Sequence, residues 1–307
     1  MTLKVIRAGL QTSIQGAPRM GLRHLAVPAG GSADPLSMAL ANRLVDNALS
    51  AAGLEITLSG ALFECDRDLA VAVTGAEAAV SVNGQAVDMH ATLRLTPGDH
   101  LDIGAARSGA RTYLAVAGEL EVPTVLGSQS TCLSAAFGGL QGRPLRDGDV
   151  LPVRTRQPVR DLRTPEALRY VPSSAAVLRA VVNHEACNDA LFDTKLAVGA
   201  RADRMGVQLT RLSACGESSL ASQPVFPGGI QLPPDGQPFV LGVDAQTTGG
   251  YTLLANVARV DRHCIGQLRP GNALRFSRRD PLQAREDFQQ KLGLFQPWLQ
   301  GAAAALR

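Results

Sequence analysis

Two glycine- and proline-rich segments in the last third of the chain limit the secondary structure that it can adopt. Residues 227–238 read PGGIQLPPDGQP, and residues 246–251 read QTTGGY. Prolines remove backbone donors and paired glycines permit positive φ, so neither segment is expected to be a helix or an uninterrupted strand. Between them, residues 239–243 form a short apolar run typical of a buried strand. We therefore expect the order loop, strand, loop.

The second loop also carries groups that suit ligand binding. Bare backbone beside short polar side chains allows close approach to a small polar or anionic molecule. A plain Gly-Gly hairpin turn is the alternative, and both interpretations stay open. The candidate binding residues in and around this loop are Gln231, Asp235, Asp244, Gln246, Thr247, Thr248, Gly249, Gly250 and Tyr251.

A high content of turn-forming residues predicts a mainly β protein. The 307 residues include 31 glycines and 18 prolines, and only 4% are aromatic. This composition favours many short strands over long helices, and Asn83-Gly84 is a strong hairpin signal. Strands are expected at residues 1–5, 54–58, 69–74, 79–82, 86–89, 93–95, 100–103, 112–117, 150–153, 176–182, 207–212, 239–243, 252–260 and 273–276.

Helices are expected at three places. Asp34 is a good N-cap and Pro35 suits a first helical position, which predicts a helix over residues 34–47. Residues 187–196 are a second candidate. The tail over residues 281–307 has an amphipathic stripe, so we expect a terminal helix that packs on a barrel or on a partner.

A recurring turn-and-strand unit suggests two similar β-rich halves. LTPGDHLDI at residues 95–103 resembles LRPGNALRF at residues 268–276, and each unit leads into an alternating strand. The arginine- and proline-rich stretch at residues 154–164 has the composition of a connection between domains. We expect a first subdomain at residues 1–155, a linker at 156–172, a second subdomain at 173–280 and a helical tail at 281–307.

Charge and cysteine spacing argue against several classes of function. The net charge is +3 and the longest basic run is Arg278-Arg279, so no nucleic-acid partner is expected. No apolar run approaches the roughly 18 residues of a membrane span, and the N-terminus lacks the apolar core of a signal peptide. Five widely separated cysteines disfavour zinc or any other metal site and fit a reducing cytoplasm.

One cluster of ionisable side chains lies before the first predicted helix. Arg19 and Arg23 provide forks that suit a carboxylate or a phosphate, and His24 can move a proton near neutral pH. The alternative is an ion pair between Arg19 and Asp34 that ties the loop to the helix cap.

Three further positions have both a functional and a structural interpretation. Residues 137–143, FGGLQGR, form either an anion-binding nest beside Arg143 or a surface turn. Asp203 and Arg204 are neighbours of a kind that is usually solvated. Glu55 is either an exposed strand glutamate or a carboxylate at a barrel mouth.

At these residues the chain resembles the biotin-dependent carboxyltransferase / allophanate hydrolase subunit 2 family. The resemblance spans roughly residues 3 to 277, and its motifs occur in the family's order. Bacterial members of this family include the C subunit of 5-oxoprolinase and the KipA-type antagonists of a sporulation kinase inhibitor. The matching segments are residues 9–15 (GLQTSIQ), 23–28 (RHLAVP), 34–35 (DP), 41–45 (ANRLV), 54–57 (LEIT), 113–118 (YLAVAG), 203–206 (DRMG), 227–238 and 246–251.

The resemblance implies two cyclophilin-like β-barrel subdomains with loops that line a cleft between them. It also implies a function as the C subunit of an ATP-dependent 5-oxoprolinase, which converts 5-oxo-L-proline to L-glutamate together with B-like and A-like partner proteins. Such a subunit is expected to be inactive alone and to share ATP with its partner. The oligomeric state of the chain itself, including a homo-oligomer, is left open.

Two alternatives follow from the same family. The first is the carboxyltransferase of a biotin-dependent urea or amide carboxylase; since the chain lacks an AMKM carrier signature, any biotin would arrive on a separate carrier. The second is a non-catalytic regulatory partner of a KipI-like protein. Gly16 and Ala245 stand where the family usually has an acid and an arginine, and these departures favour the regulatory alternative.

The family match assigns expected roles to single residues. Arg19, His24 and Glu55 are the catalytic candidates, with Arg19 or Arg204 for the substrate carboxylate and His24 or Glu55 for the proton. The remaining members, expected to bind a lactam or amide substrate, are Asp34, Asn42, Arg143, Asp203, Arg204, Gln231 and residues 246–251.

Overall fold

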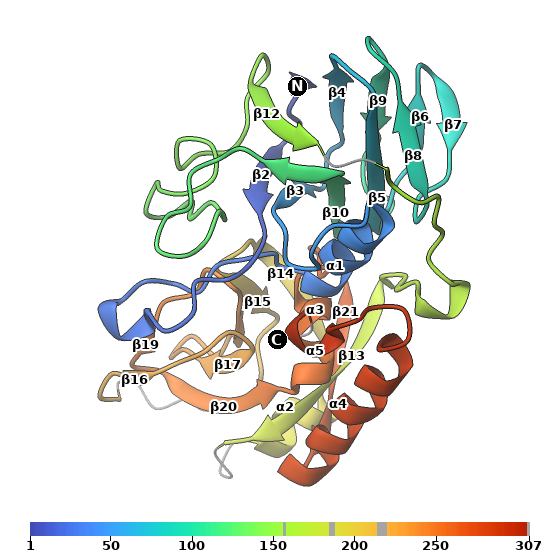
Figure 1. The fold of residues 1–307 in the computed structure, drawn as a ribbon. Helices are drawn as coiled ribbons and strands as arrows, with labels where there is room; N and C mark the ends of the chain where they lie inside the picture. The colour runs from blue at the N-terminus through green and yellow to red at the C-terminus, as the bar shows by residue number, and fades with distance from the viewer. Residues whose placement is uncertain (156–157, 184–187, 214–219, 306–307) are drawn as a thin grey trace.

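The computed structural model shows two β-rich halves, one above the other, with helices at their junction (Figure 1). It describes residues 1–155, 158–183, 188–213 and 220–305. The first half contains the blue-to-green part of the chain and the second half the yellow-to-orange part (Figure 1). The expected mainly β architecture is therefore confirmed.

The first half consists of two sheets around one apolar core. Leu3 and Phe63 from one sheet meet Ile14, Leu54 and Leu114 from the other, and all five side chains are fully buried. The larger sheet has the order β11 (Gly118–Leu120), β12 (Val150–Thr155), β1 (Thr2–Arg7), β4 (Ala61–Cys65), β9 (His100–Ile103), β6 (Val80–Val82) and β7 (Gln85–Val87). The smaller sheet has the order β2 (Gln11–Gln15), β3 (Gly53–Thr57), β10 (Ser108–Val116), β5 (Leu69–Glu77) and β8 (Thr92–Leu95).

Helix α1 (Pro35–Leu44) covers the outer face of the smaller sheet. Asp34 caps the helix by accepting a hydrogen bond from the Ser37 N–H at 2.9 Å, as its N-cap position predicts. Small side chains on the sheet, including Ala72 and Ala115, allow close contact with Leu44 of the helix. The helix is shorter than the predicted range 34–47.

The second half is a closed seven-stranded barrel with its own apolar core. A parallel pairing of β13 with β21 closes it. Around the barrel the order is β13 (Ala175–Val182), β20 (Thr252–Val257), β17 (Gly229–Leu232), β18 (Phe239–Leu241), β15 (Gly206–Leu209), β14 (Leu196–Ala202) and β21 (Ala273–Arg279). A separate ribbon pairs β16 (Gln223–Pro224) with β19 (Thr248–Gly249).

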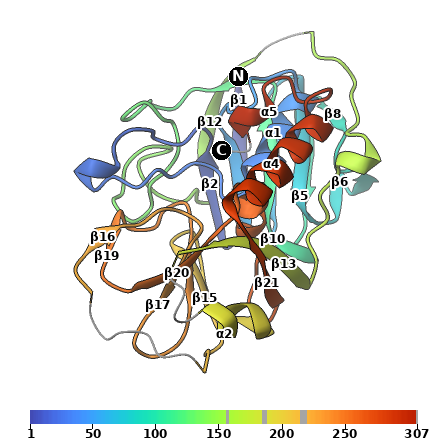
Figure 2. The same cartoon turned by 90° about the horizontal axis from the view of Figure 1, so that it is seen from below.

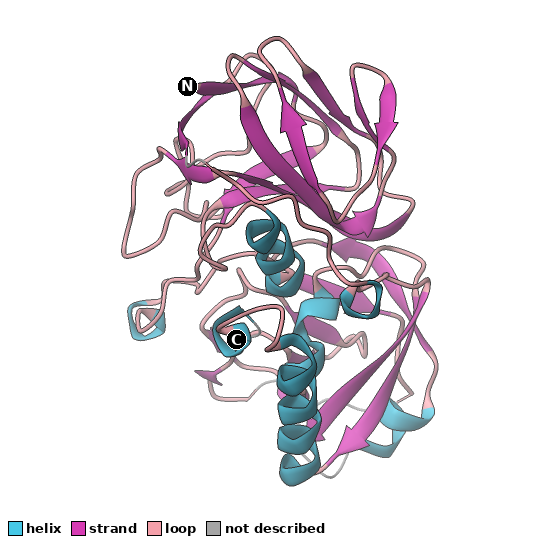
Figure 3. Cartoon of the chain, turned by 45° about the vertical axis from the view of Figure 1, so that its right-hand side comes forward, coloured by secondary structure: helices cyan, strands magenta, loops and turns pink. Residues whose placement is uncertain are grey.

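The C-terminal tail ties the two halves together. The predicted amphipathic helix is α4 (Pro281–Phe295), which is followed by α5 (Ala302–Ala305). Its apolar stripe packs on its own chain, because Phe288 and Phe295 share a cluster with Leu36 of α1. Figure 3 shows the helices at the junction of the halves and along one side of the barrel. The other helical segments among the described residues are α2 (Asn188–Asp193), α3 (Arg262–Ile265), η1 (Arg23–Leu25), η2 (Glu166–Leu168) and η4 (Arg259–Asp261).

Several other secondary-structure predictions were wrong in part. The strand expected at 252–260 ends at Val257, because Arg259–Asp261 form η4. Residues 227–238 do not form a continuous loop, since they contain strand β17, whose Ile230 and Leu232 are fully buried. Gly228, at φ 90°, and Pro233 lie just outside this strand, so the breakers bound it and do not interrupt it. The helix expected at 187–196 ends at Asp193, Leu196 already belongs to β14, and Cys187 lies outside the described residues.

The recurring turn units have the geometry that their sequences predict. Gly98 and Gly271 adopt left-handed φ angles of 83° and 86° just before β9 and β21. Asn83 and Gly84, at φ 51° and 79°, form the expected hairpin turn between β6 and β7. Strands β2, β4, β11, β14, β16 and β19 also lacked a recognised sequence signal. None of the helices in the described part of the chain has the length and apolar character needed to span a membrane.

Candidate functional site

Glu55 lies at the centre of a buried polar network between the two halves. This residue of β3 is 1% exposed. Its Oε2 accepts hydrogen bonds from the Ala33 N–H at 2.8 Å and the Tyr113 hydroxyl at 2.9 Å. Its Oε1 lies 2.7 Å from an Nη1 donor of Arg204 and 3.4 Å from the Nε of Arg111. Both oxygens of the carboxylate are therefore engaged.

Arg204 connects the barrel to the first half. It lies in the turn between β14 and β15, and its guanidinium holds Asp244 through two bonds of 2.7 and 2.9 Å. The same guanidinium reaches into the first half, where it donates to the Gly31 carbonyl at 2.7 Å and lies 3.3 Å from Gln15 Oε1. All three of its nitrogens have acceptors, although sequence neighbours such as Asp203-Arg204 are usually solvated.

The charged groups of this network keep one another ionised. Burial alone would raise the pKa of Glu55, but Arg204 and Arg111 outweigh burial and hold that pKa below its ordinary value. Burial alone would lower the pKa of Arg204, but Asp244 and Glu55 outweigh burial and raise this pKa above its ordinary value. Glu55 is therefore a carboxylate at neutral pH, and the pairing stabilises the contact between the halves.

Arg19 lies beside this network, and one of its guanidinium nitrogens is unpaired within the described chain. It is 1% exposed, its Nε donates to the Val125 carbonyl at 3.2 Å, and its Nη2 donates to the Ser130 carbonyl. The buried Nη1 has no hydrogen-bond partner among the described residues. A Cβ added at Gly30 would lie 3.4 Å from this Nη1 and 3.6 Å from Asp244 Oδ1, so both atoms border one point.

The ring of Phe137 lies against the Arg19 guanidinium, with its centroid 4.7 Å from Cζ. Burial lowers the pKa of Arg19, while the nearby Asp244 carboxylate opposes that effect. The glycine-rich loop over residues 137–143 therefore does contribute to this region. It does so through Phe137 and through Gly138, where a Cβ would lie only 2.5 Å from Arg19 Nη2.

Asp34 caps helix α1 and also belongs to the buried polar network. Its N–H donates to the Tyr113 hydroxyl at 2.7 Å, and its carboxylate accepts from Ser37 and from Gln267 Nε2 at 2.8 Å. Burial raises the pKa of Asp34, and those hydrogen bonds partly offset the rise. No ion pair between Arg19 and Asp34 forms, so the expected alternative for these two residues is wrong in this structure.

The loop at residues 246–251 lies beside the loop that carries Arg19. Arg23 makes this connection, because its Nη2 donates to the Gln246 carbonyl at 3.1 Å and to the Val225 carbonyl. Gln246 in turn donates to Gln231 Oε1 at 3.1 Å, while the buried Gln231 Nε2 has no partner among the described residues. Thr247 is half-buried, Thr248 is exposed, and Gly249 pairs in the ribbon instead of lying in a free loop.

Several predicted site residues lie outside the network. His24 is exposed on η1, and no described residue hydrogen-bonds to its ring. Asn42 is buried, and its amide donates to the Leu49 and Ala51 carbonyls, which closes the end of α1. Arg143 forms a two-bond ion pair with Asp149 at 2.8 and 2.9 Å. These contacts indicate that Asn42 and Arg143 have structural roles.

Asp203 and the end of the second loop are also separate from the network. Asp203 is exposed and accepts from the Met205 N–H at 2.7 Å, which fixes the turn between β14 and β15. Gly250 accepts from the Leu220 N–H through its carbonyl, and Tyr251 is 42% exposed. The structure thus joins Glu55, Asp34 and Arg204 in one hydrogen-bonded network. Arg19 lies beside this network, near Asp244, and Thr248 lies in the ribbon, where it pairs with Pro224.

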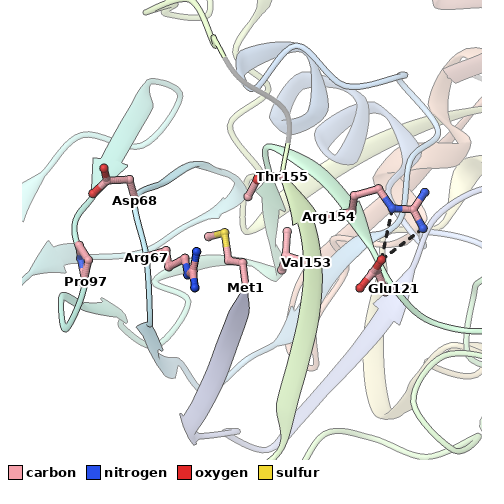
Figure 4. Close-up of a pocket in the computed structure, with 8 residues that line it drawn as sticks. All are labelled: Met1, Arg67, Asp68, Pro97, Glu121, Val153, Arg154 and Thr155. Carbon is pink, nitrogen blue, oxygen red and sulfur yellow. Dashed lines mark hydrogen bonds and ion pairs between the residues drawn. The ribbon is translucent and has the colours of Figure 1, made fainter.

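A surface pocket of about 660 Å³ lies elsewhere, at the far end of the first half (Figure 4). Met1, Arg67 and Arg154 are among its lining residues, and none of the predicted site residues borders it. Arg154 there pairs with exposed glutamates. Within the described residues, no group of three or more histidine, cysteine or acidic side chains is arranged to hold a metal ion.

Sequence reasoning missed four members of the network. Gln15 and Tyr113 lie in segments already used for the family resemblance, so their motifs were an available signal. Arg111 and Gln267 had no such signal. Gln267 is 2% exposed, and its Oε1 accepts from the Ala110 and Arg111 N–H groups at 3.1 and 3.0 Å.

Comparison with known proteins confirms the family that the sequence motifs indicate. Residues 25–278 match the model of the carboxyltransferase domain, subdomain A and B. The 5-oxoprolinase C subunit of Escherichia coli K12 is 35% identical over 303 residues, which are 94% of this chain and 96% of that protein. The protein of the same name from Haemophilus influenzae is 30% identical and is covered, like this chain, over 87% of its length.

Longer proteins contain a similar domain. The urea amidolyase of Lachancea kluyveri is 29% identical over 89% of this chain but only 17% of its own length. The solved protein TTHA0988 superposes with a TM-score of 0.84 at 35% identity, over 90% of this chain and 56% of that chain. The Kluyveromyces lactis urea carboxylase gives a TM-score of 0.87 at 26% identity, over 98% of this chain and 29% of that chain.

Proposed function

This chain belongs to the carboxyltransferase domain family with subdomains A and B, and we propose that it is the C subunit of an ATP-dependent 5-oxoprolinase. In this assembly it works with a B-like and an A-like protein to convert 5-oxo-L-proline to L-glutamate, and it is inactive alone. The observation that carries the proposal is the end-to-end match to a protein named as the C subunit of 5-oxoprolinase, over 94% and 96% of the two chains. The urea amidolyase match, by contrast, covers 17% of its protein.

The substrate offers a carboxylate and a lactam carbonyl, and Arg19 is the side chain with a donor to spare. Its Nη1 is buried and unpartnered among the described residues, so an oxyanion placed there gains a charge-assisted hydrogen bond without displacing another acceptor. Arg204 was the other candidate for this role. Since all its nitrogens already have acceptors, we assign it to positioning Glu55 and Asp244.

Glu55 is a better positioning residue than a proton carrier. Three hydrogen-bond donors and the Arg111 guanidinium occupy its two oxygens, and its lowered pKa disfavours proton uptake near neutral pH. His24 is free of such contacts with described residues and lies on the loop that holds Arg19. We therefore keep His24 as the candidate proton carrier and place Glu55 behind the reacting groups.

The proposal also includes the phosphate donor and the cellular location of the complex. We propose that ATP is shared with the B-like protein and that the assembly works in the cytoplasm. An anion-binding donor such as Arg19 Nη1 fits one oxyanion of a substrate or a phosphate. Biotin enters only under the alternative function, on a separate carrier.

The test is 5-oxoproline-dependent ATP hydrolysis by the purified assembly of this chain with its B-like and A-like partners. Arg19→Gln removes a charged donor worth about 1.5–3 kcal/mol, so kcat/KM for 5-oxoproline is expected to fall roughly 10- to 150-fold. Arg143→Gln is the matched control, because that arginine pairs with Asp149 outside the network, and its turnover is expected to stay within about twofold. Normal turnover by a folded Arg19→Gln variant would remove Arg19 from the site.

One observation favours a second function, a carboxyltransferase for urea or another amide. The K. lactis urea carboxylase superposes over 98% of this chain. Carboxyl transfer from a biotinylated carrier to urea, with no ATP hydrolysis dependent on 5-oxoproline, would select this function. A tight complex with the B-like protein that turns over neither substrate would select the third function, a regulatory partner of a KipI-like protein.

A further inference from the structure

Arg23 is a second arginine with an unused donor, and it belongs to a different group of contacts from Arg19. Its helical turn η1 (blue) and the β16–β19 ribbon (orange) lie side by side at the left of Figures 1 and 2. The Nη2 of Arg23 donates to the Val225 carbonyl and to the Gln246 carbonyl at 3.1 Å, which ties the two segments together. The buried Nη1 of the same guanidinium has no hydrogen-bond partner among the described residues.

A second unused donor lies in this group of contacts. The side-chain amide of Gln246 donates to Gln231 Oε1 at 3.1 Å, which fixes the orientation of the Gln231 amide and leaves Nε2 as its free end. Gln231 is 2% exposed, so its unpaired Nε2 is closed off from bulk solvent. A Cβ at Gly249 would overlap this Nε2, and the ribbon therefore passes over the amide only with a glycine at this position. Arg23 and Gln231 thus both contact Gln246, and each holds one buried donor without an acceptor.

No carboxylate balances the charge of Arg23 in the described part of the chain. Burial lowers the pKa of Arg23, and no neighbouring charge acts against that effect. Arg19 differs, because the Asp244 carboxylate lies near its free Nη1 and opposes the effect of burial on its pKa. A fully ionised group at Arg19 Nη1 would be repelled by Asp244, whereas the same group at Arg23 meets a cation without a competing carboxylate. Arg23 is therefore the better partner for a full negative charge.

A charged donor and an amide donor, both unpaired, suit an oxyanion better than a neutral or cationic group. We propose that Arg23 and Gln231 form the subsite for the carboxylate of the lactam substrate and leave Arg19 for the lactam oxygen. The identity of the substrate rests on the proposed function. The inference deepens that function by assigning the two polar ends of the substrate to different side chains, so that Arg23 and Gln231 select lactams that carry a carboxylate.

The test compares two lactams that differ only in the carboxylate. Isothermal titration calorimetry measures the dissociation constants of 5-oxoproline and of pyrrolidinone, the same ring without the carboxylate, for the full chain. The wild type is expected to bind 5-oxoproline at least about tenfold more tightly, because pyrrolidinone leaves the charged donor unpaired. Arg23→Gln is expected to weaken only 5-oxoproline and to bring the two constants within about twofold of each other. Arg19→Gln is expected to weaken both lactams.

Gln231→Glu tests the subsite while the contacts of Arg23 stay in place. Glutamate keeps an oxygen that accepts from Gln246 but replaces the free Nε2 by a second carboxylate oxygen, which repels the substrate carboxylate. The affinity for 5-oxoproline is expected to fall about tenfold or more, and that for pyrrolidinone to stay within about twofold. The matched control is Gln283→Glu at the exposed start of α4, which makes the same change in charge and keeps the acceptor for the Asp280 N–H. It is expected to keep the wild-type affinity for both lactams.

Each outcome decides the subsite, with unliganded melting temperatures showing which variants are folded. A wild type that binds both lactams equally overturns it, and so do folded Arg23→Gln and Gln231→Glu variants that keep the preference for 5-oxoproline. Variants that lose affinity for inorganic phosphate but keep this preference assign the donors to a phosphate and also overturn it. If Arg23→Gln does not fold, Gln231→Glu decides alone.

The proposed function fails separately from the subsite. A chain that prefers 5-oxoproline through Arg23, in an assembly without 5-oxoproline-dependent ATP hydrolysis, rejects the 5-oxoprolinase assignment and supports the subsite. A fully active assembly whose Arg23→Gln variant keeps the preference rejects only the subsite. A wild-type chain that binds neither lactam also rejects the subsite, and ATP hydrolysis by the assembly then decides the function.

Discussion

Replacing Arg204 with methionine tests whether the network between the halves holds the structure together. Methionine keeps much of the length of the side chain but removes the charge and all the donors. Asp244 then loses both bonds from the guanidinium, and Glu55 keeps only Arg111, Tyr113 and the Ala33 N–H. Both carboxylates stay buried, at 2% and 1% exposure.

The expected loss of stability follows from that burial. Removing one partner of a buried ion pair costs about 3–5 kcal/mol, because the remaining charge is left uncompensated in a medium of low polarity. We therefore expect Arg204→Met to lower the free energy of unfolding by about 3–5 kcal/mol at pH 7. The matched control is Arg154→Met, whose ion pairs with Glu119 and Glu121 are exposed and worth about 0–1 kcal/mol.

The loss should also depend on pH in a defined direction. In the wild type the pKa of Glu55 is depressed, so its contribution to stability is present above the unfolded pKa of about 4.3 and is lost as pH falls through the folded pKa. In the variant, burial acts with less opposition and raises the pKa of Glu55 toward the neutral range. Protonation of Glu55 at lower pH then removes the uncompensated charge in the variant. The difference in the free energy of unfolding between the wild type and the variant therefore shrinks between pH 7 and pH 5.

Urea unfolding followed by fluorescence of Trp298 at pH 7 and pH 5 measures both quantities. A deficit no larger than that of Arg154→Met, or one that grows as the pH falls, would refute the argument that Arg204 compensates buried charge. A lowered m-value would indicate that the halves separate before the barrel unfolds, and the deficit would then be taken from the first transition.

Three further predictions concern other parts of the chain. Phe288→Ala should cost about 3–5 kcal/mol by urea unfolding because α4 joins the halves, whereas Leu282→Ala on the exposed side of α4 should cost under about 0.5 kcal/mol. Gly60→Ala should strongly reduce soluble yield, since its Cβ would lie 1.8 Å from the Ile103 carbonyl oxygen. Burial raises the pKa of Cys264 to about 12, so mass spectrometry should find alkylation at pH 8 far slower in the native chain than in urea; equal rates would contradict that burial.

Local chemistry in the sequence was sufficient to predict many elements of the fold. Asp34 followed by Pro35 correctly placed the start of α1, and Asn83-Gly84 correctly placed a hairpin turn. Strand β17 was missed because Pro and Gly on either side of four residues were read as breaking the whole segment. In the sequence alone, glycines and prolines that bound a strand cannot be distinguished from those that interrupt one. The partner strands β18 and β20 make this distinction for β17.

The network could not be predicted in the same way, because its members belong to different halves. Glu55 and Arg204 are 149 positions apart, and neither flanking sequence indicates a partner. Asp203 and Arg204 are adjacent, yet one is exposed in a turn and the other is among the most buried ions of the described chain. Only the packing of the barrel on the first half separates these two cases.

Arg19 and Arg204 also differ in a way that bears on function. Every guanidinium nitrogen of Arg204 has an acceptor, as a structural ion requires. Arg19 is equally buried, but its Nη1 has no acceptor among the described residues, and an unmade hydrogen bond of this kind costs about 1–3 kcal/mol. The guanidinium that carries this donor is held by the Val125 and Ser130 carbonyls of the first half, and the donor lies near Asp244 of the second half. An oxyanion bound to this donor would recover the cost, so binding of 5-oxoproline should raise the melting temperature of the wild type and not that of Arg19→Gln.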